Sequence, residues 1–236
     1  MPTLNTPFLS VIVPVYNEGD RLLSFVKHIF ERIGRENQVI VVDGGSDDQS
    51  IYQLKTYAKC EENLSVISAP KSRALQMNAG AKKAKTDNLL FLHADTLLPD
   101  LAISELLYFS TSKYIWGRFD VRLNNASLPY KIISWFINKR SRLTSIATGD
   151  QAIFIRRDIF EKINGYVEQP LMEDIDISVR LKRISPPYCI KTVVTTSARK
   201  WESEGVIKTV WLMWKLRASY ARGVSPKKLV KEYYKH

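Results

Sequence analysis

Three acidic positions, far apart in the chain, have surroundings that could support chemistry. The first is Asp43, which ends an apolar run and is followed by Gly44 and Gly45. Its carboxylate could accept hydrogen bonds from a nucleobase or a ribose, while the glycines, which lack a side chain, let a ligand approach the backbone. The same residues are typical of an aspartate that caps a turn, and the sequence leaves both interpretations open.

The second position is Asp95, in the segment His93-Ala94-Asp95 that follows another apolar run. A carboxylate beside a site for anionic phosphates commonly binds a divalent cation, because the cation offsets the phosphate charge. One carboxylate alone is weak support for such a site. Its place at the end of an expected strand strengthens the hypothesis.

The third position is the pair Glu173-Asp174, which opens a strongly helical segment. Two carboxylates there could simply complement the positive N-terminal end of the helix dipole. Alternatively, one of them is a general base, held ionised at the helix start and able to take a proton from an alcohol.

Elements that could position these residues are clearest in the first 95 residues, where apolar runs alternate with amphipathic segments. This alternation, with short connections, predicts parallel β-α-β units and a doubly wound sheet with helices on both faces. Ligands bind at the carboxyl ends of the strands in such sheets, so polar residues there should converge. We expect strands over residues 8–15, 38–42, 64–69 and 88–93, helices over 21–32, 49–59 (with Asp47 or Ser50 as N-cap) and 72–85, and convergence of Asn17, Glu18, Asp43, His93 and Asp95.

The second half of the chain has a less regular pattern. Residues 115–123 alternate apolar and polar side chains, which indicates a mixed or edge strand. The remaining expected elements are an amphipathic basic helix over 129–143, a strand over 152–155, helices over 157–163 and 173–184, a strand over 188–195, and a helical tail over 205–236 interrupted near Gly223 and Pro226.

Composition and charge narrow the class of protein. The chain has 236 residues, 45% of them hydrophobic, and 35 Lys and Arg against 24 Asp and Glu, for a net charge of +11. Such an excess predicts attraction to phosphates on nucleotides, nucleic acid or lipid. Two cysteines without ligand-like spacing argue against a disulfide framework or a zinc site. Without a signal-peptide pattern at residues 1–7, or an apolar run of the ~20 residues that span a bilayer, we expect a cytoplasmic protein.

The ordered motifs resemble those of family 2 inverting glycosyltransferases, over residues 10–181. Four motifs in one order are far more specific than any one of them. Further stretches resemble a small bacterial branch without membrane spans. The family motifs are Pro14-Val15-Tyr16-Asn17-Glu18, Val42-Asp43-Gly44-Gly45-Ser46 with Asp48, His93-Ala94-Asp95 and Glu173-Asp174, and the branch stretches are residues 149–154, 170–174 and 197–202.

That resemblance implies a GT-A fold, an α/β domain whose mostly parallel nucleotide-binding sheet has a mixed edge and helices on both faces. We therefore expect residues 1–236 to form a single glycosyltransferase domain. Its parts would be a nucleotide-binding half over about 8–98, an acceptor-binding half over about 99–200, and a basic helical tail over about 201–236.

Roles also follow from the resemblance, position by position. Asp174 matches the catalytic base, which would deprotonate the acceptor hydroxyl for one in-line attack that inverts the anomeric carbon. Asp95 matches the aspartate that holds Mn²⁺ or Mg²⁺ against the diphosphate of a nucleotide-sugar, usually UDP-linked. The remaining implied donor residues are Pro14, Glu18, Asp43, Arg73 and His93, and those expected on the acceptor side or supporting the site are Gly149, Asp150, Gln151, Glu173, Arg199, Lys200 and Trp201.

Three departures from the family pattern bear on these expectations. Gly44 replaces the usual second aspartate after strand two, so nucleoside contacts would be fewer. His93 replaces the first aspartate of the metal motif and could contact ribose, ligate the metal or weaken metal binding. The Gln-x-x-Arg-Trp signature of processive synthases is reduced to residues 197–201, so processive synthesis is not expected.

Basic segments with interleaved aromatic residues allow two interpretations. Residues 131–142 and 208–217 could be interfacial helices that rest on anionic lipid, with a lipid-linked acceptor, or core-packed helices with a solvated basic face. Rival functions are a nucleotidyltransferase, a nucleotide-sugar-binding member without turnover, and a basic nucleic-acid-binding protein. Carboxylates at the predicted ligand edge would repel a polyanion, so no nucleic-acid partner is expected.

Overall fold

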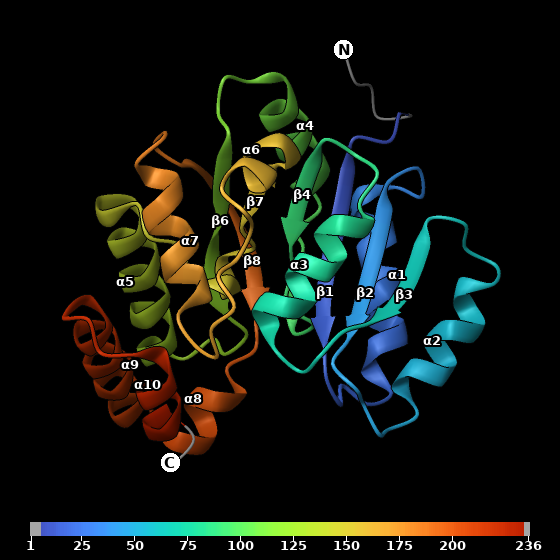
Figure 1. Cartoon of the computed structure of the whole chain (residues 1–236). Helices are drawn as coiled ribbons and strands as arrows, with labels where there is room; N and C mark the ends of the chain where they lie inside the picture. Colours follow the sequence, from blue (N-terminus) through green and yellow to red (C-terminus); the bar gives the residue numbers. More distant parts are fainter. Residues whose placement is uncertain (1–5, 234–236) are drawn as a thin grey trace.

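A single eight-stranded sheet organises the protein, in the order β3-β2-β1-β4-β7-β6-β8-β5 (Figure 1). The structure is a computed structural model and describes residues 6–233. The segments 1–5 and 234–236, which include most of the N-terminus searched for a signal peptide and the end of the expected tail, lie outside the described residues. The strands are β1 Leu9–Val15, β2 Gln38–Asp43, β3 Leu64–Ser68, β4 Asn88–Phe91, β5 Thr96–Leu97, β6 Trp116–Leu123, β7 Phe154–Arg156 and β8 Tyr188–Thr196.

The four expected strands of the first half are present and run parallel, β3 with β2, β2 with β1, and β1 with β4. Alternate residues of β1 point to opposite faces, as the period of two in a strand requires. Val11 and Val13 pack in one core with helix α1 (Arg21–Ile33), and Ile12 packs in a second core with α3 (Arg73–Lys83). Both faces of the sheet are covered, which confirms the doubly wound arrangement.

The close contact between α3 and the sheet depends on a glycine inside the helix. A Cβ on Gly80 would lie 2.4 Å from Cγ2 of Ile12 and 3.1 Å from Cγ2 of Val42. We expect Gly80→Ala to lower the free energy of unfolding by about 1–3 kcal/mol, because overpacking outweighs the better helix propensity of alanine. Thermal and urea unfolding measure the change. A more stable variant would contradict the prediction, and the double variant with Ile12→Ala should lose less than the sum of the single changes.

The N-cap of helix α2 (Ser50–Ala58) is not one of the two residues expected from the sequence. Its N-cap is Gln49, and the cap makes no side-chain hydrogen bond, so neither Asp47 nor Ser50 is the cap. Asp48 instead accepts hydrogen bonds from the backbone and side chain of Ser50 and from the backbone N–H of Gly19. This carboxylate therefore connects the loop after β1 to the start of α2.

The second half extends the sheet with mixed pairing. β7 runs antiparallel to β4 and β6, whereas β6 runs parallel to β8. The segment 115–123 is thus a mixed strand in the sheet interior, and its alternative as an edge strand was wrong. Elements without a counterpart among the expected ones include β5 and helix α4 (Ala102–Thr111), whose Leu106 and Phe109 complete the first core. The other helices are α5 Leu128–Thr144, the 3₁₀ turn η1 Gly149–Gln151, α6 Arg157–Lys162, α7 Glu173–Lys182, α8 Arg199–Glu204, α9 Val206–Ala221 and α10 Pro226–Tyr233.

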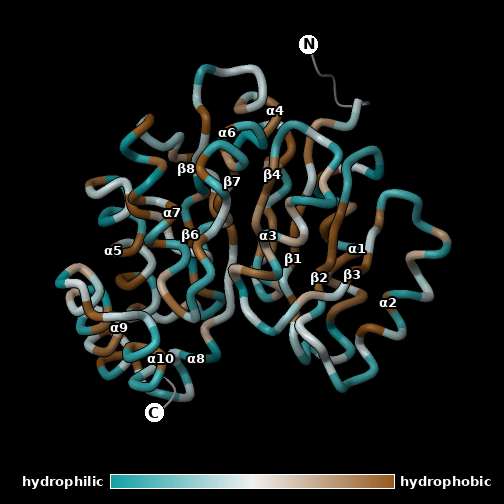
Figure 2. Tube along the Cα trace, viewed as in Figure 1, coloured by the Kyte–Doolittle hydropathy of each residue, from teal (hydrophilic) through white to brown (hydrophobic). Residues whose placement is uncertain are grey.

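The tail folds back onto the domain as α8, α9 and α10. Leu212 and Leu216 of α9 and Leu229 of α10 are buried against Met172 and Ile175, beside the start of α7. Hydrophobic residues are concentrated in the strands, and hydrophilic ones mainly in loops (Figure 2). Among the described residues, no helix combines the length and the apolar character that crossing a bilayer requires.

Candidate active site

A cavity of about 970 Å³ opens where β1 and β4 end, and it extends beneath the three tail helices. Of the fourteen candidate site residues, eleven line it, so residues up to 187 positions apart in sequence meet there. Asp43, Gln151 and Arg199 are not among the lining residues, nor is Asn17. The eleven are Pro14, Glu18, Arg73, His93, Asp95, Gly149, Asp150, Glu173, Asp174, Lys200 and Trp201.

Asp43 is buried at the end of β2 and organises the turn that follows. Its Oδ1 accepts hydrogen bonds from the backbone N–H of Ser46 at 2.9 Å and from the Ser46 hydroxyl at 2.7 Å. The observed geometry is that of the turn-capping interpretation. A neighbouring residue that the sequence did not single out, Gln76, donates hydrogen bonds to the carbonyls of Val15 and Val42, both at 2.8 Å, and lines the cavity.

Gly44 has a packing role beside that glutamine. A Cβ at Gly44 would lie 3.2 Å from Nε2 of Gln76. A larger residue there would crowd the amide that connects the ends of β1 and β2. Gly44, which replaces the usual second aspartate of the family, therefore lies where a side chain would crowd Gln76.

Asp174 lies in the first turn of α7 with both carboxylate oxygens bonded. Oδ2 accepts the backbone N–H of Gly149 at 3.0 Å, and Oδ1 accepts that of Ile175 at 2.7 Å. Burial raises the pKa of Asp174, and the carboxylate of Asp150 adds to the rise, although the two N–H donors act in the opposite direction. Asp174 is therefore a fixed carboxylate that is more basic than an ordinary aspartate.

His93 connects the end of β4 to η1. Its Nδ1 lies 3.2 Å from Oδ1 of Asp150, and a Cβ on Gly149 would lie 2.3 Å from its Cε1 and 2.4 Å from its Nε2. Both ring nitrogens thus face the Gly149–Asp150 turn. The same turn donates a hydrogen bond to Asp174 through the backbone N–H of Gly149. It therefore connects His93, which stands in place of the metal-motif aspartate, to the candidate base Asp174.

We expect Gly149→Ala to reduce kcat by roughly 100-fold, because the new methyl group and the His93 ring cannot both keep their places and a shift of the turn would move Asp174. Steady-state turnover of the variant measures this. The double variant with His93→Ala relieves the clash, so it should be no worse than His93→Ala alone. Unchanged kcat in Gly149→Ala would contradict the coupling.

Two carboxylates, those of Glu18 and Asp95, line the β1 and β4 side of the cavity. Burial and the negative charge of Asp95 raise the pKa of Glu18, whereas Arg199, Arg21 and His93 lower it. Arg199 is exposed outside the lining, but its charge reaches Glu18. Two carboxylate groups close enough to repel each other are hard oxygen donors of the kind that bind Mg²⁺ or Mn²⁺.

A divalent cation fits this donor set only with help from a substrate. Within residues 6–233, no cluster of three or more His, Cys, Asp or Glu side chains could hold a metal ion. Mg²⁺ is typically bound by one or two carboxylates together with substrate phosphates and waters, and Asp95 has an exposed carboxylate at the cavity. The residues present therefore fit a metal site that a diphosphate completes.

Comparison with known proteins places the chain in a family. Residues 10–163 match the family described as glycosyl transferase family 2. The chain belongs to this family.

Two curated relatives are named as glycosyltransferases. The chain is 23% identical to "Probable glycosyltransferase YdaM" of Bacillus subtilis, over 92% of this chain and 55% of that protein. It is 25% identical to an uncharacterized glycosyltransferase of Haemophilus influenzae, over 48% of this chain and 46% of that protein. The chain thus spans about half the length of these curated relatives.

Solved structures show the same GT-A fold. The mannosyltransferase PcManGT of Pyrobaculum calidifontis, in complex with GDP-Man and Mn²⁺, matches with a TM-score of 0.66 and 17% identity, over 94% of this chain and 66% of that one. TarS 1–349 of S. aureus, in complex with UDP-GlcNAc, matches with a TM-score of 0.64 and 16% identity, over 80% of this chain and 58% of that one. These similarities confirm the expected fold.

In this family member, the tail forms a wall of the cavity. Lys200 of α8 holds its Nζ 3.3 Å from the ring centroid of Tyr233 in α10, and both residues line the cavity. Carboxylates of Glu173, Asp150 and Asp174 raise the pKa of Arg73, although burial by itself would lower it. The tail residues on the cavity wall were missed by sequence analysis, because no local pattern indicates which core a C-terminal helix packs against. They are Thr209, Met213, Leu216, Arg217, Val230 and Tyr233.

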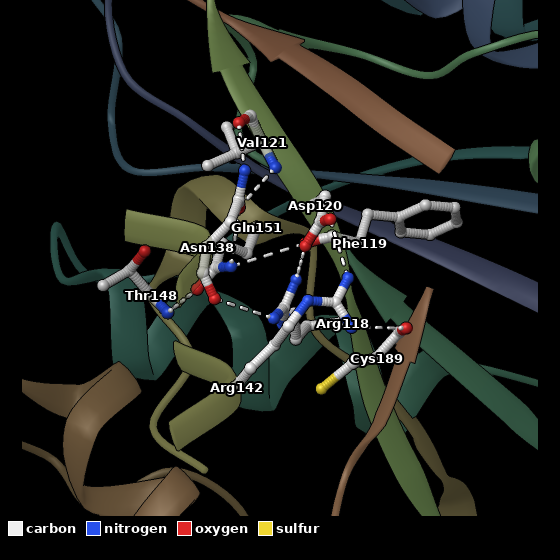
Figure 3. A network of polar contacts seen from close by, with 9 residues as sticks. All are labelled: Arg118, Phe119, Asp120, Val121, Asn138, Arg142, Thr148, Gln151 and Cys189. Carbon is white, nitrogen blue, oxygen red and sulfur yellow. Dashed lines mark hydrogen bonds and ion pairs between the residues drawn. The ribbon is translucent and has the colours of Figure 1, made fainter. Parts of the chain in front are cut away.

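A polar network that includes Thr148 and Gln151 lies beside η1 (Figure 3). Gln151 is fully buried, and its Oε1 accepts the N–H of Thr148 at 3.2 Å, so it supports the turn rather than lining the cavity. Its Nε2 lies 3.4 Å from Oδ1 of Asn138, which joins α5 to β6 through two bonds with Val121. The fully buried Arg118 shares the carboxylate of Asp120 with Arg142, within the same network.

Proposed function

We propose that this chain transfers a sugar from a nucleotide-sugar, with UDP as the nucleotide, to an acceptor hydroxyl in one inverting step, with Asp174 as the general base. The observation that carries the proposal is the meeting of Asp174 with the strand-end carboxylates Glu18 and Asp95 in one cavity of about 970 Å³. A proton acceptor and a phosphate-facing metal site are the two functions that such a displacement needs.

Two solved relatives of this fold support a nucleotide-sugar donor. PcManGT holds GDP-Man with Mn²⁺, and TarS holds UDP-GlcNAc. The nucleotide differs between them, so both UDP and GDP belong in the test. The cavity is large enough for a ligand of this class, since small-molecule sites commonly measure ~300–1,000 Å³.

In the proposed reaction, Asp174 accepts the proton of the acceptor hydroxyl as its oxygen bonds to the anomeric carbon. The bond from that carbon to the diphosphate oxygen breaks on the opposite side, so the configuration inverts, and the nucleoside diphosphate leaves with the electron pair. The N–H groups of Gly149 and Ile175 fix the carboxylate in place. Its raised pKa makes the ionised carboxylate a better proton acceptor than that of an ordinary aspartate.

On the leaving-group side, Asp95 and Glu18 would hold Mn²⁺ or Mg²⁺ against the diphosphate. The metal, when bound, supplies Lewis-acid stabilisation of the charge that develops on the leaving oxygen. Arg73 and Lys200 also line the cavity, and their positive charges would stabilise the same diphosphate. Metal dependence and the roles of these cations are part of the proposal.

Isothermal titration calorimetry with UDP and with GDP, each with and without Mn²⁺, tests the donor site directly. We expect Mn²⁺-dependent binding of UDP. Equal binding without metal would overturn the metal-assisted mechanism, and no binding of either nucleotide would overturn the donor site. If UDP binds, a screen of UDP-sugars by release of UDP identifies the sugar, and NMR of the product reports whether the configuration is inverted.

A further inference from the structure

Helix α5 is apolar on two opposite faces. Ile133 is buried and Ile137 packs beside it in a cluster with the tail, as expected for the inner face of a surface helix. The outer face should then be polar. Instead, Leu128, Trp135 and Phe136 are exposed to solvent by 69%, 54% and 57%, respectively.

The neighbouring helix α9 has the same property. Its inner face contributes Leu212 and Leu216 to the core, while Ile207, Trp211 and Trp214 are exposed by 85%, 64% and 71%. The spacing of these three residues, i, i+4 and i+7, places them along one side of the helix. The outer apolar residues of α9 therefore form a continuous stripe.

Together, the outer faces of α5 and α9 form one surface region, which we call the α5–α9 face. The two helices share a hydrophobic cluster, in which Tyr130 and Ile137 of α5 lie with Val206 and Val210 of α9. Both lie at the rim of the molecule farthest from β3 (Figure 1), and hydrophobic stretches occur along both (Figure 2). Of fifteen exposed large hydrophobic side chains within residues 6–233, eight belong to these two helices, so the apolar exposure is concentrated there.

Charge on these helices has a single sign. Their sequences contain seven Lys and Arg residues and no Asp or Glu. Lys139 lies 5.7 Å from the ring centroid of Trp135, and Lys215 lies 5.4 Å from that of Trp211. Aliphatic lysine stems can lie along apolar surface while the ammonium groups extend toward headgroups, and tryptophan favours the interface between lipid and water.

We propose that the α5–α9 face docks on the surface of a bilayer that contains anionic lipids. Exposed aromatic and aliphatic side chains would enter the headgroup region, and Lys131, Lys139 and Lys208 would contact lipid phosphates. Lys215 is paired with Glu232 of α10 at 3.0 Å, but Lys131, Lys139 and Lys208 are exposed on the two helices, which contain no acidic residue of their own. This excess of positive charge favours a membrane over an apolar protein partner, because anionic headgroups complement it. The proposal concerns binding only and does not rest on the proposed function.

Docking in this orientation has a consequence for the cavity. The other side of α9 presents Thr209, Met213 and Arg217 to the cavity. A helix with its side chains is ~10–12 Å across, so the cavity wall would lie about one helix diameter from the headgroups. With the proposed function, docking would bring the cavity close to an acceptor anchored in the membrane, and this consequence depends on that function.

Flotation of the chain with vesicles of phosphatidylcholine containing 30% phosphatidylglycerol, in low salt, tests the proposal. We expect the chain to float with these vesicles and not with pure phosphatidylcholine, and added NaCl should release it. The variant Trp135→Ser with Trp211→Ser should reduce the partition coefficient by roughly tenfold or more, and Lys131→Glu with Lys208→Glu by a similar factor.

Matched controls change the same residue types on other surfaces. Tyr52→Ser with Tyr108→Ser removes two exposed aromatic side chains from α2 and α4, and Lys82→Glu with Lys83→Glu reverses two exposed charges at the end of α3. Both control variants should float like the wild type. Thermal unfolding verifies that each variant is folded.

Three outcomes would overturn the proposal. They are no flotation of the wild type with anionic vesicles, equal flotation with neutral vesicles, and an equal loss in the control variants. A wild-type dimer in light scattering that the tryptophan substitutions dissociate, without vesicle binding, would instead assign the face to a second copy of the chain. UDP titration of the same preparations reports separately on the donor site. A failure of the membrane-docking proposal can therefore be distinguished from a failure of the proposed function.

Discussion

Replacing Asp174 by Asn is expected to reduce kcat by roughly 1,000-fold while leaving the affinity for the nucleotide nearly unchanged. General-base catalysis typically contributes ~10²–10⁴-fold, and an amide cannot accept the proton of the acceptor hydroxyl at neutral pH. Asparagine keeps the size of the side chain and one oxygen for the N–H groups of Gly149 or Ile175. Steady-state kinetics and UDP titration on the same preparation separate the two effects.

The pH profile gives a second readout of the same residue. The base functions only when ionised, so activity should fall as the pH drops through the pKa of Asp174. Because burial and Asp150 raise that pKa, the acidic limb should lie above the range of an ordinary aspartate. The residual activity of Asp174→Asn should lack this limb.

A matched control is Asp158→Asn. Asp158 is an exposed carboxylate in the first turn of α6, so it shares the helix position of Asp174 without facing the cavity. Its kcat should remain that of the wild type. Near-normal turnover in Asp174→Asn would show that another group accepts the proton, and the proposed mechanism would be rejected.

The second large effect is expected from Asp95→Asn. This change should weaken UDP binding in the presence of Mn²⁺ by roughly 100-fold and leave the weaker metal-free binding unchanged, because the variant loses the carboxylate that holds the metal against the diphosphate. Calorimetric titration with and without Mn²⁺ measures both values. Mn²⁺ alone should bind weakly to the wild type, since the described residues offer no cluster of three ligands.

Asp100→Asn is the corresponding control. Asp100 is an exposed carboxylate five residues further along that pairs with Arg32 at 2.9 Å. Its UDP affinity should keep the wild-type dependence on Mn²⁺. Should Asp95→Asn retain that dependence as well, the metal would have to be placed elsewhere in the cavity.

Local patterns in the sequence were sufficient to predict the first half of the fold. The apolar runs at β1, β2 and β4 are buried on both faces, and such runs between amphipathic segments encode parallel strands with little dependence on context. The order of the motifs indicated the family, and the resemblance singled out Asp95 and Asp174 as candidate site residues. Both residues lie where elements begin or end, and those positions can be read from the chain itself.

Tertiary structure decided the roles that depend on pairs of distant residues. His93 faces Asp150, and Asp174 accepts a hydrogen bond from the backbone N–H of Gly149. Periodicity cannot reveal such pairs, because it reports on neighbours along the chain and carries no information on contacts between residues 57 or 25 positions apart.

The tail and the α5–α9 face depended on tertiary structure for the same reason. A basic amphipathic pattern is compatible with packing against the core or with lying on a membrane, and in α5 and α9 one face is packed while the other is exposed. The sequence determined that these helices are apolar and basic. Which apolar residues are buried was decided only when the folded chain placed the helices beside each other and over the cavity, since burial is a property of the whole packing arrangement.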